Sequence, residues 1–345
     1  MRIKAIHFKV ITAALMALAC MMPLSLLADP VQNRSMTPAA RHAQRADDVF
    51  LSPMGLIPPE RKEPGFIFHR ASKKDAVQLL KEAGEVERTG DWKKAIGIYD
   101  QIVRSYPYAI EAAEAQLRIG RLQEKRGKYK KAFEEYRYLL YYYPENAPAD
   151  LVLKQMFAIA NFYEKRGDSS EAMDYYEKIT DIAPKWKYTP MAFLHLGMMQ
   201  LEKKKYLDAA STFDAIMTGY PGTPIASKAA VSHAIVLNTL ANKYPEDDAT
   251  QLKAISSART ALVLGEKGSE EHVKIAASLE KLVARRYDRH YQMAVFYDCS
   301  RYPRETKIAA YKDFLRRFPQ APQARKARAR LAQLEQANAG KHSSR

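Results

Sequence analysis

The residue types that perform catalysis are present in this chain, but they do not combine into a catalytic or metal-binding pattern. The eight histidines are scattered, and none forms the His-Glu-x-x-His pair that holds zinc on one helix face. No glycine-rich phosphate loop and no Gly-x-Ser-x-Gly elbow occurs. Asp247 and Asp248 lack the further carboxylates and the glycine of a calcium loop. His195 and Cys299 fall in predicted helices, where a packed side chain is the better interpretation than a ligand or a nucleophile. The sequence therefore predicts that the protein is not an enzyme and uses no cofactor or metal.

Charge is distributed unevenly along the 345 residues, which carry a net charge of +16. Residues 1–70 carry +4, residues 71–270 carry +2, and residues 271–345 carry +10. A protein that binds nucleic acid needs basic side chains along its binding surface, so the nearly neutral middle disfavours that class of partner. The cationic C-terminal end requires a separate explanation.

The first 28 residues have the pattern of a secretory signal. Arg2, Lys4 and Lys9 precede an uncharged, mostly apolar stretch over residues 10–28. A transmembrane anchor is less favoured, because Pro23 interrupts the stretch and no basic cluster follows it. We therefore expect an exported protein located in the periplasm.

Two routes of signal processing stay open. Cleavage after Ala28 would release the chain, whereas the lipobox-like residues Met16 to Cys20 would make Cys20 an acylated first residue. Either route leaves Cys299 as the one other thiol, so no intramolecular disulfide is expected.

The segments that flank the body of the chain are predicted to lack regular structure. Residues 29–70 are rich in proline without a sustained period, which indicates an extended tether. Within it, Phe66–Phe68 are expected to dock on the first helix pair. Residues 338–345 are expected to form a disordered tail.

The strongest signal is an internal repeat of four units. An alanine recurs at spacings of 37, 40 and 37 residues, a small residue precedes it by 12, and an aromatic and then a proline follow it. Taken unit by unit, these positions are Ala83, Ala95, Tyr99 and Pro107; Gly120, Ala132, Tyr136 and Pro144; Ala160, Ala172, Tyr176 and Pro184; and Gly197, Ala209, Phe213 and Pro221.

Each unit is predicted to form two amphipathic helices, over residues 111–125 and 129–142 in the second unit. The small residue lets the two helix axes approach, the aromatic fills the space between neighbouring pairs, and the proline ends the second helix. Glycine occupies the turn between the helices in three units, and Lys204 replaces it in the fourth.

The pattern continues more weakly toward the C-terminus. A fifth pair is predicted over residues 224–264, a sixth from residue 270, and a capping helix over residues 322–337. The predicted fold is therefore all-α, an α-solenoid of about five to six helical hairpins with a C-terminal capping helix. Repeats 1–4 are assigned to residues 71–222, and repeats 5–6 with the cap to residues 223–337.

This pattern resembles the tetratricopeptide repeat, with a period stretched beyond the usual length of about 34 residues. In such an array the first helices line a concave groove that binds peptides. Each single groove position also fits a solvated helix face, and that alternative stays open. The groove candidates are Leu80, Glu87, Leu117, Arg121, Glu124, Phe157, Asn161 and Glu164, with Lys125 and Lys165 at the rim.

Three tyrosines fall outside the repeat pattern. Tyr138, Tyr141 and Tyr142 either form a convex contact patch or pack around the longer loop. The sequence leaves both interpretations open.

The C-terminal part is similar to the last repeat of the BamD family, the lipoproteins of outer-membrane β-barrel assembly. The likeness lies in residues 291–297, 309–319 and 323–324, where an Ala-x-x-Tyr helix leads to a Phe-Pro turn. It implies a non-enzymatic scaffold on the periplasmic face of the outer membrane, attached by a lipid anchor or by a partner. The groove candidates would then contact barrel precursors, and the C-terminal repeats would dock on the barrel insertase.

The resemblance also assigns a role to the cationic end. Reversing Arg285, Arg286 and Arg289 to glutamate is expected to weaken docking and to leave thermal stability nearly unchanged. Another periplasmic adaptor with the same repeat, in cell-envelope or cell-division organisation, is the alternative function. The docking candidates are Arg285, Arg286, Arg289, Arg316 and Arg317.

Overall fold

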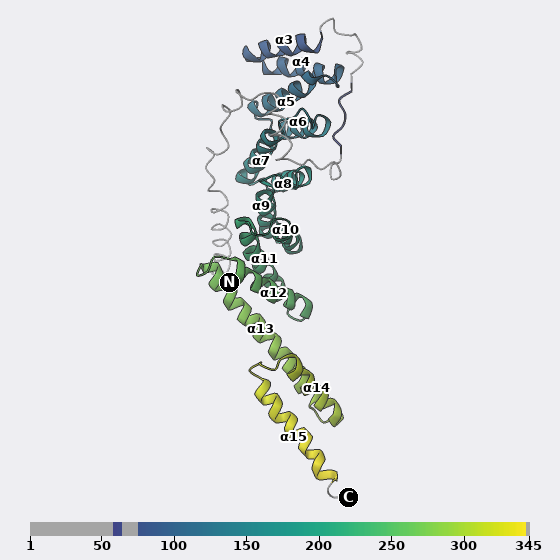
Figure 1. The fold of residues 1–345 in the computed structure, drawn as a ribbon, viewed down its shortest axis with the longest axis vertical. Helices are drawn as coiled ribbons and strands as arrows, with labels where there is room; N and C mark the ends of the chain where they lie inside the picture. Colours follow the sequence, from purple (N-terminus) through teal and green to yellow (C-terminus); the bar gives the residue numbers. More distant parts are fainter. Residues whose placement is uncertain (1–57, 64–74, 343–345) are drawn as a thin grey trace. The chain divides into compact units, whose positions relative to one another are not determined.

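The computed structural model describes residues 58–63 and 75–342. Within these ranges the chain forms thirteen α-helices and no β-strand, which confirms the predicted all-α fold of helical hairpins (Figure 1). Contacts between residues divide the helices into two compact units, one ending at Lys203 and one beginning at Lys204. We call them unit 1 and unit 2. The proposed signal over residues 1–28, Cys20, Phe66–Phe68 and most of the tether lie outside the described residues.

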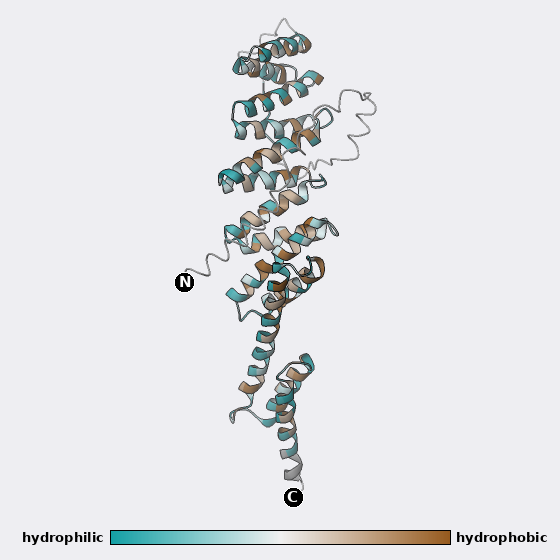
Figure 2. Cartoon of the chain, turned by 90° about the vertical axis from the view of Figure 1, so that its left-hand side faces the viewer, coloured by the Kyte–Doolittle hydropathy of each residue, from teal (hydrophilic) through white to brown (hydrophobic). Residues whose placement is uncertain are grey.

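Unit 1 contains seven of the described helices. Each helix packs on the next one along the chain (Figure 1). In Figure 2 these helices carry both hydrophilic and hydrophobic residues, as amphipathic helices do. Their bounds are α3 Ala76–Arg88, α4 Trp92–Ser105, α5 Ile110–Lys125, α6 Tyr129–Tyr142, α7 Ala149–Arg166, α8 Ser169–Ile182 and α9 Thr189–Glu202.

Unit 2 contains the other six described helices, again packed in chain order. The fifth pair and the long helix begin and end within a few residues of their predicted bounds, and the last helix continues to His342, past the predicted start of the tail. The bounds are α10 Tyr206–Gly219, α11 Pro224–Lys243, α12 Asp248–Leu264, α13 Glu270–Tyr297, α14 Arg304–Arg317 and α15 Ala324–His342. No helix within the described ranges combines the length and the apolar character needed to cross a bilayer.

In each of the first four hairpins, one residue in the left-handed backbone region forms the turn before the second helix. Gly90, Gly127 and Gly167 have φ angles of 86°, 69° and 86°. Lys204 precedes α10 with a φ of 59° and is the one non-glycine residue with positive φ in the described part of the chain. A side chain in this conformation costs roughly 1–2 kcal/mol, so the fourth turn is strained where the other three are not.

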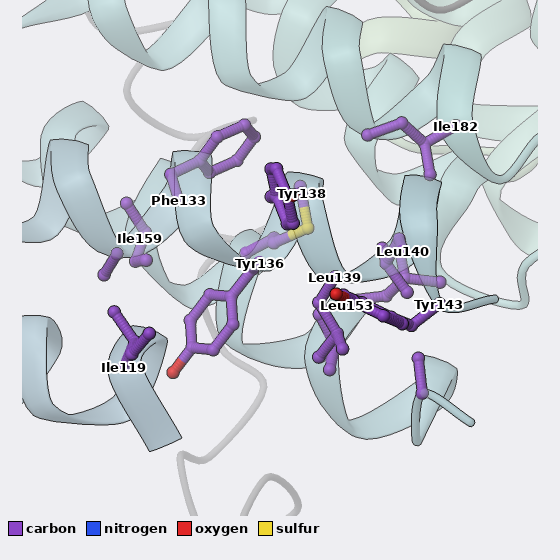
Figure 3. Packing of buried hydrophobic residues seen from close by; sticks show 14 of the residues in the cluster. Ile119, Phe133, Tyr136, Tyr138, Leu139, Leu140, Tyr143, Leu153, Ile159 and Ile182 are labelled. Atoms are coloured by element: carbon purple, nitrogen blue, oxygen red, sulfur yellow. The ribbon is translucent and has the colours of Figure 1, made fainter. Parts of the chain in front are cut away.

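The repeated positions of the sequence form the core. The alanines Ala95, Ala132, Ala172 and Ala209 are all fully buried. The aromatic residue that lies between the alanine and the proline of each unit is also buried and at most 2% exposed. These residues are Tyr99, Tyr136, Tyr176 and Phe213. Figure 3 shows this packing at α6, where Phe133, Tyr136 and Leu139 point into the core.

Four residues outside the repeat register were also subjects of prediction, and the structure describes each of them. Cys299 lies just after the end of α13 and is exposed, so its prediction as a packed residue within a helix was wrong. His195 is 5% exposed, which confirms a packed histidine. Tyr138 is buried, and Tyr142 is half-buried and donates its hydroxyl hydrogen to the carbonyl oxygen of Pro59 at 2.7 Å. Part of the proposed tether therefore covers these tyrosines, so they do not form a free convex patch.

Candidate functional site: the groove positions of α3, α5 and α7

The groove candidates lie on the first helices of three successive hairpins in unit 1. On each helix the apolar candidate and the glutamate are seven residues apart, which places them on one face. The apolar positions are Leu80 on α3, Leu117 on α5 and Phe157 on α7, and the acidic positions are Glu87, Glu124 and Glu164. The structure therefore repeats one apolar and one acidic position on α3, α5 and α7.

Each of these glutamates is held by the buried aromatic of its own hairpin. The tyrosine hydroxyl, twelve residues further along the chain, donates a hydrogen bond to the carboxylate. The Oη to Oε2 distances are 2.9 Å for Tyr99 and Glu87, 2.8 Å for Tyr136 and Glu124, and 2.5 Å for Tyr176 and Glu164. Because each tyrosine ring is buried in the core, the hydrogen bond fixes the position of each carboxylate within its hairpin.

The first two glutamates differ in their other neighbours. Glu87 lies 3.7 Å from Arg118 Nη1 and 3.8 Å from Lys125 Nζ, so the first two hairpins are linked by charge. Burial raises the pKa of Glu124 above its ordinary 4.5, although Tyr136 and Arg121 favour its ionised form. Burial therefore disfavours the ionised form of Glu124.

Glu164 belongs to a buried network of four side chains. His195 Nδ1 lies 2.9 Å from Glu164 Oε2, and these side chains are only 6% and 9% exposed. Tyr176 Oη is also 2.6 Å from Oδ1 of Asn161, another groove candidate. Burial opposes ionisation of Glu164, but the hydrogen bonds from His195 and Tyr176 prevail and lower its pKa below 4.5.

Phe157 is part of the core as well as a groove position. It is 8% exposed, and its ring centroid lies within 5.6–6.5 Å of four other rings. The surrounding aromatic side chains are Tyr176, Trp186, Tyr188 and His195. Phe157 therefore offers little surface to a ligand.

The remaining candidates are accessible to different degrees. Leu80, Leu117 and Arg121 are half-buried, whereas Lys125 and Lys165 are exposed at the C-terminal ends of α5 and α7. Among the groove candidates, the accessible side chains are thus two half-buried leucines and Arg121, beside the bonded carboxylates and the exposed lysines.

Glu124→Gln and Glu164→Gln are expected to change stability with pH in opposite directions. A lowered folded-state pKa means that Glu164 stabilises the fold above about pH 4.5 and loses this contribution as the pH falls. A raised folded-state pKa means that the contribution of Glu124 is present at low pH and is lost as the pH rises past 4.5. Urea unfolding at about pH 3.5 and about pH 7 gives the free energy of unfolding of each variant minus that of the parent chain. From the lower to the higher pH, this difference should become more negative for Glu164→Gln and more positive for Glu124→Gln. Equal pH trends in the two variants would contradict the assignment.

The docking candidates of unit 2 fall into two groups. On α13, Arg285 bonds the C-terminal end of α11, Arg286 bonds the first residue of α12, and Arg289 bonds the loop between these two helices. Arg316 and Arg317, at the end of α14, are exposed and share Asp313 as an ion-pair partner. Arg286 Nε is 3.0 Å from Asp248 Oδ1, and its guanidinium lies 5.1 Å from the Phe318 ring centroid. Reversing Arg286 to glutamate would remove both contacts and set two carboxylates side by side. We therefore expect this reversal to lower thermal stability, in contrast to the expectation from the sequence.

Unit 2 has an exposed apolar pair that was not predicted from the sequence, Met293 and Phe296. With Gln292 they follow Arg289 at i+3, i+4 and i+7 on α13, and these residues line a shallow hollow together with Glu246. Met293 is 49% exposed and Phe296 is 64% exposed. The i, i+3, i+4, i+7 spacing can be seen in the sequence. The sequence does not show, however, that Met293 and Phe296 stay exposed in the fold.

Comparison with known proteins identifies the repeats. Residues 80–150 and residues 155–185 each match a tetratricopeptide-repeat family model, and neither model describes an enzyme family. No curated protein matches the chain. Among the described residues, no three His, Cys, Asp or Glu side chains are grouped so as to hold a metal ion.

Several solved structures are similar at low identity. A tetratricopeptide repeat protein from Parabacteroides merdae is 15% identical, with 75% of this chain and 98% of that chain covered and a TM-score of 0.29. YrrB, described as a protein with an unusual peptide-binding site, is 16% identical over 61% and 97% of the two chains, with a TM-score of 0.30. PilF from Pseudomonas aeruginosa is 14% identical over 74% and 97%, with a TM-score of 0.28.

The family matches and the hairpin geometry agree over the same part of the chain. Proteins with this repeat generally act as non-catalytic scaffolds that bind other proteins. Residues 80–150 and 155–185 are therefore tetratricopeptide repeats.

Proposed function

We propose that this protein is a periplasm-facing scaffold in outer-membrane β-barrel assembly, similar to the BamD family. The observation that carries the scaffold role is the repeated Tyr–Glu hydrogen bond, which fixes one carboxylate per hairpin along the groove positions of unit 1. The export signal pattern and the C-terminal resemblance in sequence support the more specific role. Another periplasmic tetratricopeptide adaptor, in cell-envelope or cell-division organisation, is the alternative.

The two units suit two kinds of contact. Unit 1 offers half-buried leucines and fixed carboxylates to an extended segment, such as that of a barrel precursor. Unit 2 offers the exposed cations Arg316 and Arg317 and the apolar Met293 and Phe296, which suit a folded partner such as a barrel insertase. Attachment to the outer membrane would come from acylated Cys20 or from that partner.

Binding to the barrel insertase of the same organism tests the proposal. Its periplasmic domains should bind the purified chain, and Phe296→Ala together with Arg316→Glu and Arg317→Glu should weaken binding at least about tenfold. Val263→Ala, which removes another exposed apolar side chain, from α12, should leave the affinity unchanged. Absence of binding to the insertase, with recovery of cell-division proteins from envelope extract, would favour the alternative.

A further inference from the structure

The described segment 58–63 lies across the first two hairpins of unit 1. Pro59 is buried and Lys62 is half-buried, whereas the other four residues of the segment are exposed. Two inward positions three residues apart are expected of a polyproline II conformation, which repeats every three residues. The segment therefore presents one face, made of Pro59 and Lys62, to the repeats.

Three hydrogen bonds hold the backbone of the segment. Tyr142 on α6 donates its hydroxyl hydrogen to the Pro59 carbonyl oxygen at 2.7 Å. The Lys62 backbone N–H donates to Tyr138 Oη at 3.3 Å, and Arg104 Nη1 on α4 donates to the Glu63 carbonyl oxygen at 2.8 Å. Contacts of this kind recognise an extended chain whatever its side chains are.

The Lys62 side chain supplies the specificity. Its ammonium nitrogen lies 2.7 Å from Glu135 Oε2, 3.1 Å from Asp100 Oδ1 and 3.2 Å from Gln116 Oε1. A lysine ammonium has three N–H donors, and three acceptors from three different helices meet them here. The same nitrogen lies 5.3 Å from the centroid of the Tyr138 ring, which adds a cation–π contact.

Gln116 shows that the repeats hold this pocket in place. Its side chain is fully buried, and its Nε2 donates to the Glu135 carbonyl oxygen at 2.9 Å and to Glu135 Oε2 at 2.7 Å. Its Oε1 is thereby turned toward Lys62 Nζ. Without a donor there, a buried acceptor would lose its hydrogen bond, and the carboxylates of Asp100 and Glu135 would lose the cation they share. The pocket therefore requires a cationic side chain.

We propose that this pocket, here called the lysine slot, recognises an extended peptide with proline and lysine three residues apart, and that residues 59–63 fill it as an internal ligand. The slot shares no residue with the groove candidates, so the proposal stands apart from the proposed function. Its residues are Asp100, Arg104, Gln116, Glu135, Tyr138 and Tyr142.

An internal ligand competes strongly with an external one. A tethered segment has an effective concentration in the millimolar range, so a free peptide of the same sequence should bind the parent chain poorly. A substitution that weakens binding of the internal segment, without changing the slot residues, should let a free peptide bind. Lys62→Ala does this, because it removes the ammonium from the segment and leaves all six slot residues in place.

The test uses a labelled peptide of residues 57–65 and the full chain carrying Lys62→Ala. Fluorescence anisotropy should show the peptide binding this variant at least about tenfold more tightly than the parent chain. A peptide with alanine in place of its lysine should not bind, and Glu135→Gln added to the variant chain should weaken binding of the unchanged peptide. Lys62→Met, which keeps most of the length of the side chain and removes its charge, serves as a second variant if Lys62→Ala lowers the melting temperature measured by circular dichroism.

The results separate a recognition site from incidental packing. Lysine-dependent binding to either Lys62 variant supports the proposal. Equal affinity for the variants and the parent chain, no binding to any of them at millimolar peptide, or equal binding of the lysine-free peptide overturns it. None of these outcomes bears on binding to a barrel insertase.

Discussion

Replacing Trp186 by alanine is expected to lower the free energy of unfolding by about 3–5 kcal/mol. The side chain is 1% exposed, and its ring packs at 6.1 Å from the Phe157 centroid and at 5.0 Å from that of Tyr188. Its Nε1 also donates a hydrogen bond to Asp150 Oδ1 at 2.9 Å. The substitution removes a large buried ring and leaves Asp150 without this donor. Urea unfolding followed by circular dichroism measures the loss.

Trp186→Phe is the matched control. It keeps a ring against Phe157 and removes the N–H group that Asp150 uses, so the expected loss is about 1–2 kcal/mol. A loss below about 1 kcal/mol for Trp186→Ala would mean that this aromatic cluster is not part of the core of unit 1.

This cluster decides how groove variants of α7 should be interpreted. Phe157 packs on Trp186, and Glu164 and Asn161 bond Tyr176 in the same layer. Truncating any of them disturbs the core and the groove together. Loss of ligand binding in these variants would therefore not by itself assign a ligand contact. Leu117 and Lys125 on α5 are better probes, because their side chains are partly or largely accessible.

The repeated hairpins could be predicted because their signals are local. Within one hairpin, the small residue, the alanine, the aromatic and the proline all act on neighbours less than about forty residues away. Gly120, Ala132 and Tyr136 are a buried example of that register. The groove positions followed from the same register, since a helix places residues four and seven apart on one face.

Contacts between distant segments could not be predicted in the same way. Tyr138 and Tyr142 meet residues that precede them by 76 and 83 positions, in a segment without a period. Arg286 likewise meets Asp248, 38 residues earlier. A sequence shows how many charges a segment has, but the fold decides which of them are neutralised within the chain. For this reason the sequence predicted that all five docking arginines are free to bind a partner, whereas the three on α13 contact groups within the chain.

Gly120→Ala is expected to lower the free energy of unfolding by about 2 kcal/mol. An added Cβ would lie 2.5 Å from Tyr136 Cε1 and 2.7 Å from Cδ1, far inside contact distance. The Tyr136 ring cannot retreat easily, because it is fully buried and its hydroxyl is bonded to Glu124. Overpacking of this kind typically costs 1–3 kcal/mol or more, and the gain of about 1 kcal/mol in helix propensity offsets only part of it. Thermal and urea unfolding of the variant measure the balance.

Gly97→Ala, the same substitution at another helical glycine, is expected to raise the free energy of unfolding. Gly97 lies within α4, and an added Cβ there meets no atom within 4 Å. Only the helix propensity changes, so stability should rise by about 1 kcal/mol. The two variants should therefore differ by about 3 kcal/mol in free energy of unfolding, although the chemical change is identical. If Gly120→Ala were as stable as Gly97→Ala, the approach of α5 to α6 would not depend on the small residue. The physical basis of the repeat register would then have to lie elsewhere.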